Sequence, residues 1–373
     1  MQFANDEAVM QRALELAVRG FGSVEPNPQV GAVIVTPSRQ LIAEGWHERF
    51  GGPHAEIRAI EAAGSRTRGA DIFITLEPCS HHGKTPPCVD ALLRAGFRRV
   101  IVGCVDPAPH AAGRGLRLLR EAGVAVESGL CQAAAEDLIA PFARQMLRKL
   151  PWVHAKWAMS IDGRVATDTG HSKWISSEQS RQLVHDMRGR MDAILTGAGT
   201  VRADDPLLTA RPPGPRRPLR VVFDAIGQSL TPKSRLVQSA ADGPVLVCVT
   251  DACSSEQQLW LRSLGLEVFS SGTGEQVDAR EVLAELGRRG LTHVFLEAGP
   301  GLLGSFFNEQ LVDEIHVFVS MKIIGGQRRG SAVAGRESLK VPSLDQLRNL
   351  RTRHIGGDVL IEGTMKWATA ISR

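Results

Sequence analysis

The stretch of sequence that decides the fold of the first half of the chain is residues 51–88, which read GGPHAEIRAIEAAGSRTRGADIFITLEPCSHHGKTPPC. Residues 53–63 have the pattern of a helix, and residues 71–76 have that of a strand. A second helix is predicted over residues 88–95. Strands that alternate with helices predict an α/β fold in which helices pack on both faces of a sheet.

The same alternation extends through the rest of the chain. Before and after this stretch it predicts a helix over 6–20 and strands over 30–35, near 41–43 and over 99–103, followed by further helix and strand up to 148. It breaks at Pro151 and then restarts, with strands over 153–159, 192–196, 219–223, 245–249, 294–296 and 315–319, and helices over 177–190, 255–264, 278–288 and 302–309. The length of 373 residues fits two domains. We therefore predict domains over residues 1–148 and 149–373.

Composition excludes several classes of protein. The chain is 43% hydrophobic and 23% charged, and 44 basic residues against 40 acidic ones leave a net charge of +4. So small an excess argues against a dedicated nucleic-acid binder, and no apolar run approaches the roughly 18 residues of a membrane span. Six scattered cysteines and an N-terminus without signal-peptide features predict a cytoplasmic protein with reduced thiols. A small molecule remains the expected partner.

The residues 54–88 carry the strongest chemical signal. One imidazole and two thiolates, from His54, Cys79 and Cys88, form a donor set that suits tetrahedral zinc and leaves a fourth position for water. Zinc lowers the pKa of such a water to roughly 7. Pro53 suits a first helical position, so His54 and Glu56 are expected to converge in the opening turn, with Glu56 as the proton shuttle. The alternative is a closed structural zinc site with His81 or His82 as a fourth ligand.

The order of these residues resembles a known enzyme family. His-x-Glu followed by Pro-Cys is typical of zinc nucleobase deaminases. The eight residues between the two cysteines, together with Asn27-Pro28, residues 30–35 and residues 51–56, resemble the pyrimidine deaminases of riboflavin biosynthesis. The resemblance implies a cytidine-deaminase-like α/β/α fold over residues 1–148, and it implies that substrate contacts come from Asn27, His47, His81 and Lys84. The chain departs from the family at Ala108 and Ile139, where asparagine is usual or frequent.

A glycine-rich turn marks the second half of the chain. Gly299, Gly301 and Gly304 follow a predicted strand and lead into a predicted helix, in the pattern G-x-G-x-x-G. A dinucleotide-binding Rossmann unit needs an acidic residue at the end of the next strand, whereas Asp313 and Glu314 precede that strand. We therefore reject a Rossmann domain and predict a phosphate-binding loop, with a tight strand-to-helix turn as the alternative.

Three segments, 156–164, 196–209 and 296–300, resemble the C-terminal reductase of the same riboflavin enzymes. That resemblance implies a dihydrofolate-reductase-like α/β fold and NADPH as cofactor. It implies that NADPH contacts come from Ala158, Trp174, Thr200, Asp204, Gly299, Pro300, Gly301, Leu302, Leu303, Gly304 and Ser305. It implies that substrate contacts come from Ser172, Arg188, Leu208, Arg211 and Glu297. Lys156 and Asp162 are our candidates for orienting or protonating the substrate, and Arg188 and Arg211 suit a ribose phosphate.

Taken together, the chain is identified as a member of the bifunctional riboflavin-biosynthesis deaminase/reductase family. The resemblance implies zinc-dependent deamination of 2,5-diamino-6-(ribosylamino)-pyrimidin-4-one 5′-phosphate, with one zinc per chain, and then NADPH-dependent reduction of the ribosyl to a ribityl chain. It also implies a homo-oligomer, a dimer or a tetramer. One alternative is a deaminase of another substrate whose second domain only binds; the eight-residue insert counts against it. The other is a zinc-stabilised binding module, which would have no use for Glu56.

Overall fold

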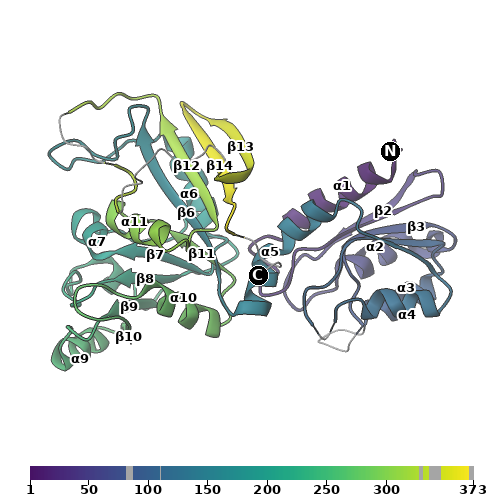
Figure 1. Ribbon diagram of the computed structural model, residues 1–373, viewed down its shortest axis with the longest axis horizontal. Helices are drawn as coiled ribbons and strands as arrows, with labels where there is room; N and C mark the ends of the chain where they lie inside the picture. The colour runs from purple at the N-terminus through teal and green to yellow at the C-terminus, as the bar shows by residue number, and fades with distance from the viewer. Residues whose placement is uncertain (81–86, 110, 327–330, 336–345, 369–373) are drawn as a thin grey trace. The chain divides into compact units, whose positions relative to one another are not determined.

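The computed structural model describes the chain except for residues 81–86, 110, 327–330, 336–345 and 369–373 (Figure 1). The chain divides into two compact units, Met1–Arg148 and the described part of Lys149–Thr369. Each unit is built from strands that alternate with helices, so the predicted α/β class is confirmed. Among the described residues, no helix has both the length and the apolar character needed to cross a membrane.

The first unit contains a five-stranded sheet in the order β2-β1-β3-β4-β5. Strand β1 pairs antiparallel with β2 and with β3, whereas β3, β4 and β5 run parallel. The strands are β1 (Gly31–Val35), β2 (Leu41–Trp46), β3 (Asp71–Leu76), β4 (Arg99–Cys104) and β5 (Ala125–Ser128). The α-helices are α1 (Asp6–Ala17), α2 (Ala55–Ala63), α3 (Cys88–Ala95), α4 (Arg114–Glu121) and α5 (Gln132–Arg148).

Helices cover both faces of this sheet, as the alternation predicts. One face carries α1 and α5 and the other carries α2, α3 and α4 (Figure 1). Successive residues of the central strands contribute to two different hydrophobic cores, one on each face of the sheet. Val33 and Phe73 pack toward α1, whereas Ile34 and Ile72 pack toward α2. Because both faces are covered, every residue of β1 and of β3 is buried, and neither strand shows an alternation of buried and exposed residues.

The second unit contains a nine-stranded sheet in the order β10-β9-β8-β7-β11-β6-β12-β14-β13. The strands from β10 to β12 run parallel, and β14 and β13 add an antiparallel hairpin at one edge. The strands are β6 (Trp152–Ser160), β7 (Ala193–Gly197), β8 (Leu219–Phe223), β9 (Val245–Val249), β10 (Glu267–Ser270), β11 (His293–Leu296), β12 (Glu314–Ser320), β13 (Leu347–Ile355) and β14 (Asp358–Met365). The α-helices are α6 (Glu178–Arg188), α7 (Ala198–Asp204), α8 (Arg235–Gln238), α9 (Ser255–Ser263), α10 (Ala279–Arg288) and α11 (Pro300–Asn308).

Several features of the second unit, among them helix α8, differ from the pattern read from the sequence. Residues 198–204, expected as a glycine-rich loop, form helix α7 directly after β7. The edge hairpin of β13 and β14 was not predicted, because six of the nine residues of β13 are exposed and the strand lacks an apolar period. Strand β10 is also missing from the prediction, since it is short and has no buried residue.

Candidate functional site

Three predicted metal ligands converge in the first unit. His54 Nδ1 lies 3.6 Å from Cys79 Sγ and 3.3 Å from Cys88 Sγ. A tetrahedral zinc with one nitrogen and two sulfur ligands holds its nitrogen and sulfur atoms roughly 3.6 Å apart. All three ligand atoms lie within 4.8 Å of one another, so the donor set and its spacing fit zinc.

The start of α2 differs from the prediction and helps to form this cluster. The helix begins at Ala55 rather than Pro53, and His54 occupies its N-cap position with an extended backbone, φ −71° and ψ 166°. The carbonyl of Pro53 accepts a hydrogen bond from His47 Nδ1 at 3.1 Å, which holds Pro53 outside the helix. His54 and Glu56 nevertheless converge, since both line one cavity.

The two cysteines are positioned by different elements. Cys88 is the first residue of α3, and its backbone N–H donates to Cys79 Sγ at 3.3 Å. Cys79 follows β3 by three residues. A hydrogen bond from the Cys88 thiol lowers the pKa of Cys79 to about 4, and the same contact together with burial raises the pKa of Cys88. A bound cation would stabilise the thiolate form of both sulfurs.

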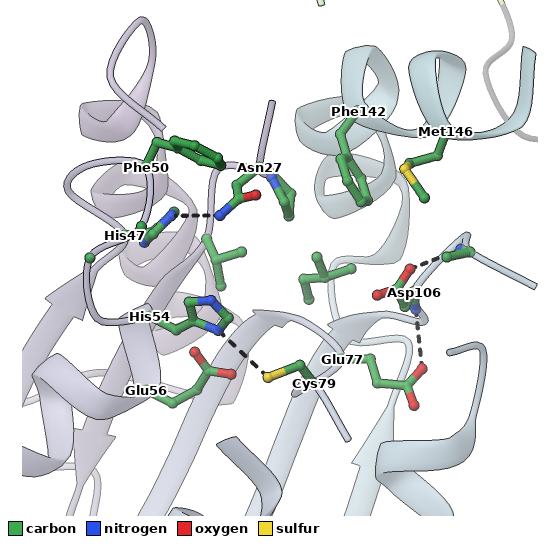
Figure 2. Close-up of a pocket in the computed structure, with 16 residues that line it drawn as sticks. Asn27, His47, Phe50, His54, Glu56, Glu77, Cys79, Asp106, Phe142 and Met146 are labelled. Carbon is green, nitrogen blue, oxygen red and sulfur yellow. Dashed lines mark hydrogen bonds between the residues drawn. The ribbon is translucent and has the colours of Figure 1, made fainter. Parts of the chain in front are cut away.

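Glu56 lies beside this cluster, in a cavity of about 340 Å³ (Figure 2). Its side chain reaches toward the space between His54 and Cys79, and the residue is 3% exposed. Burial raises the pKa of Glu56. A buried carboxylate within reach of a metal-bound ligand is the arrangement that proton transfer requires.

Two predicted substrate-binding residues line the same cavity. Asn27 Nδ2 lies 3.2 Å from His47 Nε2 (Figure 2). The Pro53 carbonyl can only accept, so His47 Nδ1 carries its proton and His47 Nε2 accepts from the amide of Asn27. Burial lowers the pKa of His47, which favours this neutral ring. The other two, His81 and Lys84, lie outside the described residues.

Sequence reasoning missed several residues of the cavity wall. Phe142 and Met146, on α5, provide an apolar wall on the side away from His47 (Figure 2). Glu77 and Asp106 also line the cavity. No motif marked the residues of α5, because their helical spacing is the same as that of core residues. Glu77 lies within the Leu-Glu-Pro-Cys segment. A carboxylate directly after a buried strand could have marked it as a residue of the site.

A second polar cluster lies in the other unit and unites three predicted residues. Arg188 holds Glu297 through two parallel bonds, Nε to Oε1 at 2.6 Å and Nη2 to Oε2 at 2.9 Å. Lys156 Nζ lies 3.9 Å from the same carboxylate. Burial lowers the pKa of Lys156, whereas Arg188 and Lys156 outweigh burial at Glu297 and lower the pKa of that carboxyl.

Arg188 was predicted to bind a phosphate, but part of its guanidinium is already hydrogen-bonded to Glu297. Its third nitrogen, Nη1, donates to the carbonyl of Thr209 at 3.3 Å, so three of its five N–H groups are engaged within the chain. Arg211 is exposed, and its Nη2 lies 3.4 Å from His185. Leu208 is buried, with a positive φ of 54°, and Ser172 is half-buried.

The glycine-rich turn joins β11 to α11. Gly299 is the N-cap of that nine-residue helix, Pro300 is its first residue, and Thr200 Oγ1 accepts from the Gly299 N–H at 3.2 Å. A helix N-terminus of this kind favours a phosphate. Leu303 and Gly304 are both buried. A Cβ at Gly304 would lie 1.5 Å from the carbonyl oxygen of Ala334, so close packing requires this glycine.

The remaining predicted residues of this unit occupy loops and strand ends. Ala158 is half-buried on β6, two residues beyond Lys156. Gly301, Leu302 and Ser305 belong to the first turns of α11.

The other predicted residues contact side chains or backbone groups of neighbouring segments. Asp204 Oδ1 lies 3.6 Å from Lys173 Nζ. Trp174 is 64% exposed, and its ring lies 4.5 Å from the guanidinium of Arg181 rather than in the core. Asp162 accepts from the N–H groups of Ile324 and Gly325 at 3.2 and 2.8 Å. These hydrogen bonds link the turn after β6 to the loop after β12.

Comparison with known proteins identifies both units. Residues 3–104 match the family of the cytidine and deoxycytidylate deaminase zinc-binding region, and residues 151–361 match the RibD C-terminal domain. The chain is 38% identical to the riboflavin biosynthesis protein RibD of Bacillus amyloliquefaciens, over 97% of this chain and 96% of that one. It is 39% identical to RibD of Escherichia coli strain K12, over 95% and 98%. The chain belongs to the RibD family.

Solved structures agree with this assignment. RibD of Acinetobacter baumannii is 34% identical and superposes with a TM-score of 0.79, covering 97% of this chain and 99% of that one. A diaminohydroxyphosphoribosylaminopyrimidine deaminase/5-amino-6-(5-phosphoribosylamino)uracil reductase from Thermotoga maritima gives the same identity and TM-score, over 96% and 98%. The predicted RibD-type fold and a two-activity enzyme of riboflavin biosynthesis, deaminase and reductase, are thereby confirmed.

The two departures of this RibD chain from its family pattern have different surroundings. Ala108 lines the cavity of the deaminase unit and is 3% exposed, so its small side chain enlarges the space near the wall. Ile139 is buried on α5 among the apolar residues between that helix and the sheet. An apolar side chain is therefore well accommodated at residue 139.

Glu77 has a structural role in this RibD chain that can be tested. Its two carboxylate oxygens accept from four backbone N–H groups, at 2.8–3.3 Å, those of Asp106, Gly113, Gly115 and Leu116. A Glu77→Gln change turns an NH₂ group toward two of these donors. At about 1–3 kcal/mol for each unsatisfied buried group, we expect the deaminase unit to lose roughly 2–6 kcal/mol of unfolding free energy.

Urea titration of the whole chain measures this loss. The urea midpoint for deaminase activity should fall in Glu77→Gln, while the midpoint for reductase activity stays at the wild-type value. Glu121→Gln, an exposed substitution at the end of α4, is the matched control and should leave both midpoints unchanged. An unchanged deaminase midpoint in Glu77→Gln would show that the four bonds contribute little.

Proposed function

We propose that the first unit hydrolyses the 2-amino group of 2,5-diamino-6-(ribosylamino)-pyrimidin-4-one 5′-phosphate. The observation that carries this proposal is a buried Glu56 beside a His54, Cys79 and Cys88 donor set at the wall of one cavity. The name of the Thermotoga maritima relative supports the substrate class, since it describes a deaminase of a phosphoribosylaminopyrimidine.

In this proposal each residue of the cavity has one task. His54, Cys79 and Cys88 would hold one zinc ion per chain, which supplies a Lewis acid and an activated water at neutral pH. Glu56 takes a proton from the attacking water and delivers it to the amine at C2, so that ammonia leaves. Asn27, oriented by His47, presents its amide to the polar edge of the pyrimidine. His81 and Lys84 remain proposed contacts to the substrate.

We propose that the second unit reduces the ribosyl group of the deaminated product to a ribityl chain with NADPH. The cofactor supplies the hydride when bound. The N-terminus of α11 and Thr200 would bind its phosphate, with Trp174, Asp204 and Ala158 as further contacts. Lys156 gives a proton to the ring oxygen as the sugar opens, while Glu297, itself held by Arg188, positions Lys156 beside the substrate. Ser172, Leu208 and Arg211 remain proposed substrate contacts.

A split assay on the zinc-loaded full chain tests both parts. The diaminopyrimidinone ribosyl phosphate is supplied, and ammonia is followed first without NADPH and then after its addition. We expect ammonia from the first phase and NADPH oxidation only once the deaminated product is present. The order matters, because the second unit acts on the product of the first.

The other outcomes decide between the alternatives. Ammonia without NADPH oxidation would leave the deaminase and remove the reductase assignment. No ammonia from a protein with verified zinc would remove this substrate, and free nucleosides and other aminopyrimidines would then be assayed. Unchanged function in Glu56→Gln with unchanged zinc would favour a zinc-stabilised binding module.

Two further properties of the chain are proposed. A homo-oligomer, dimer or tetramer, rests on the sequence resemblance alone, and light scattering of the purified chain measures it. A cytoplasmic location is supported by the six cysteines, none of which forms a disulfide. Fractionation of cells that express the tagged chain tests that location.

A further inference from the structure

A row of histidines crosses the sheet of the second unit, apart from the residues used above. His293, His154 and His316 come from the adjacent strands β11, β6 and β12, and each is no more than 5% exposed. Glu314 pairs in register with His154, and Glu362 of β14 pairs with His316. Partners in register place their side chains on one face of a sheet, so these residues form a continuous polar row.

The centre of this row has the dimensions of a metal site. His154 Nδ1 lies 3.3 Å from His316 Nε2 and 3.4 Å from Glu314 Oε2, and His316 Nε2 lies 3.7 Å from Glu314 Oε1. Nitrogen and oxygen ligands of a tetrahedral zinc lie roughly 3.4 Å apart. The spacing matches that of the His54, Cys79 and Cys88 cluster. Among the described residues, these two clusters are the groups of three or more potential metal ligands whose ligand atoms lie within 4.8 Å of one another.

The outer nitrogens of both rings are already engaged. His316 Nδ1 lies 3.1 Å from Glu362 Oε1, and Arg353 Nε donates to the other oxygen of that carboxylate at 3.1 Å. A carboxylate held by arginine accepts, so His316 Nδ1 carries the proton and Nε2 carries a lone pair. His154 Nε2 lies 3.0 Å from His293 Nδ1. A carboxylate behind a metal-binding histidine is the usual arrangement in metal sites.

Two of the three inner groups therefore present acceptors toward His154 Nδ1. His316 Nε2 has a lone pair, Glu314 offers two oxygens, and His154 Nδ1 faces both. A single proton on His154 Nδ1 would satisfy one of these contacts, whereas a divalent cation satisfies all three. Trp152 Nε1, 3.4 Å from Glu314 Oε2, adds a donor that orients the carboxylate.

We propose that His154, Glu314 and His316 form a second metal site, for a divalent ion of the zinc class. Two imidazoles and a carboxylate suit zinc and neighbouring transition metals, and three protein ligands leave a position for water. The site contains no thiolate, in contrast with the deaminase cluster. It does not depend on the proposed reactions, because none of its ligands takes part in them.

Metal content of the full-length chain tests this proposal with Zn²⁺ as the probe. After saturation and removal of loose ions, we expect two zinc ions per chain by elemental analysis. The double variant Cys79→Ala/Cys88→Ala should retain one, and Glu314→Gln or His316→Asn should also retain one while still releasing ammonia. His354→Asn, on exposed β13, is the matched control and should retain two.

Cobalt substitution distinguishes the two sites by their ligands. Co²⁺ in the deaminase cluster should show sulfur-to-metal charge-transfer absorption, which the double cysteine variant loses while it keeps weaker visible bands from nitrogen and oxygen ligation. One zinc in the wild type and none in the double cysteine variant would overturn the proposal. The row of histidines and glutamates would then be a hydrogen-bonded network without a metal. This result is decisive even if the Glu314 and His316 variants do not fold, because the double variant leaves the second unit unchanged.

Discussion

Glu56→Gln is expected to lower kcat for ammonia release by about 10²–10⁴-fold, the usual contribution of a general acid–base group. Glutamine has the shape of glutamate but cannot carry the proton from water to the leaving amine. The side chain is 3% exposed, so bulk water has little access to take over this transfer. Reduction by the second unit, assayed with the deaminated intermediate, should be unchanged.

Steady-state kinetics and elemental analysis on the same preparation check this result. Zinc content should equal that of the wild type, because Glu56 is not among the three ligands. Glu61→Gln changes an exposed glutamate of the same helix and should leave kcat unchanged. A Glu56→Gln protein that keeps its zinc and at least a tenth of the wild-type kcat would exclude Glu56 as the proton carrier.

Lys156→Met is expected to lower NADPH oxidation by about 10²–10⁴-fold, while ammonia release stays at the wild-type rate. Methionine has a similar volume, so the substitution removes the ammonium group and leaves the packing against Phe318 largely intact, where Lys156 Nζ lies 5.9 Å from the ring centroid. Glu297 keeps its bidentate partner Arg188, so no buried charge is left alone.

The pH dependence distinguishes a proton donor from a group that only binds. Burial lowers the pKa of Lys156 from 10.5, Arg188 lowers it further, and Glu297 opposes both. A protonated lysine is required as the acid, so the reductase rate should fall as pH rises through a pKa below 10.5. This alkaline decline should be absent from the residual activity of Lys156→Met.

Lys233→Met, at an exposed position of the same unit, is the matched control and should keep both the rate and the decline. A Lys156→Met protein with a raised KM for the intermediate, an unchanged kcat and the same pH profile would make Lys156 a binding residue. Another residue would then have to be the proton donor.

Much of the deaminase site could be predicted from the sequence, because its chemistry depends on rare residue types in a fixed order. A histidine, a glutamate two residues later and two cysteines after a buried strand restrict the chemistry to few possibilities, and His54, Glu56, Cys79 and Cys88 do converge. The wall formed by Phe142 and Met146 could not be predicted, since helical spacing alone does not distinguish a cavity wall from a core.

The reductase site was predicted less completely, since it depends on contacts between distant strands. Lys156 and Glu297 are separated by 141 residues, and only the parallel register of β6 and β11 brings them together. The contact between Gly304 and the backbone of Ala334 likewise belongs to the tertiary structure. A glycine that the motif assigned to phosphate binding is thus required for packing.

The sequence by itself determined the α/β class, and it predicted the break near Pro151 and the residues that would bind zinc and move a proton. Each of these follows from local periodicity or from the intrinsic chemistry of a side chain. Only the tertiary structure decided which charges are paired, as with Arg188 and Glu297, and which histidines lie in one row. The physical reason is that strand order and register, which no local pattern specifies, determine which side chains become neighbours on one face of a sheet.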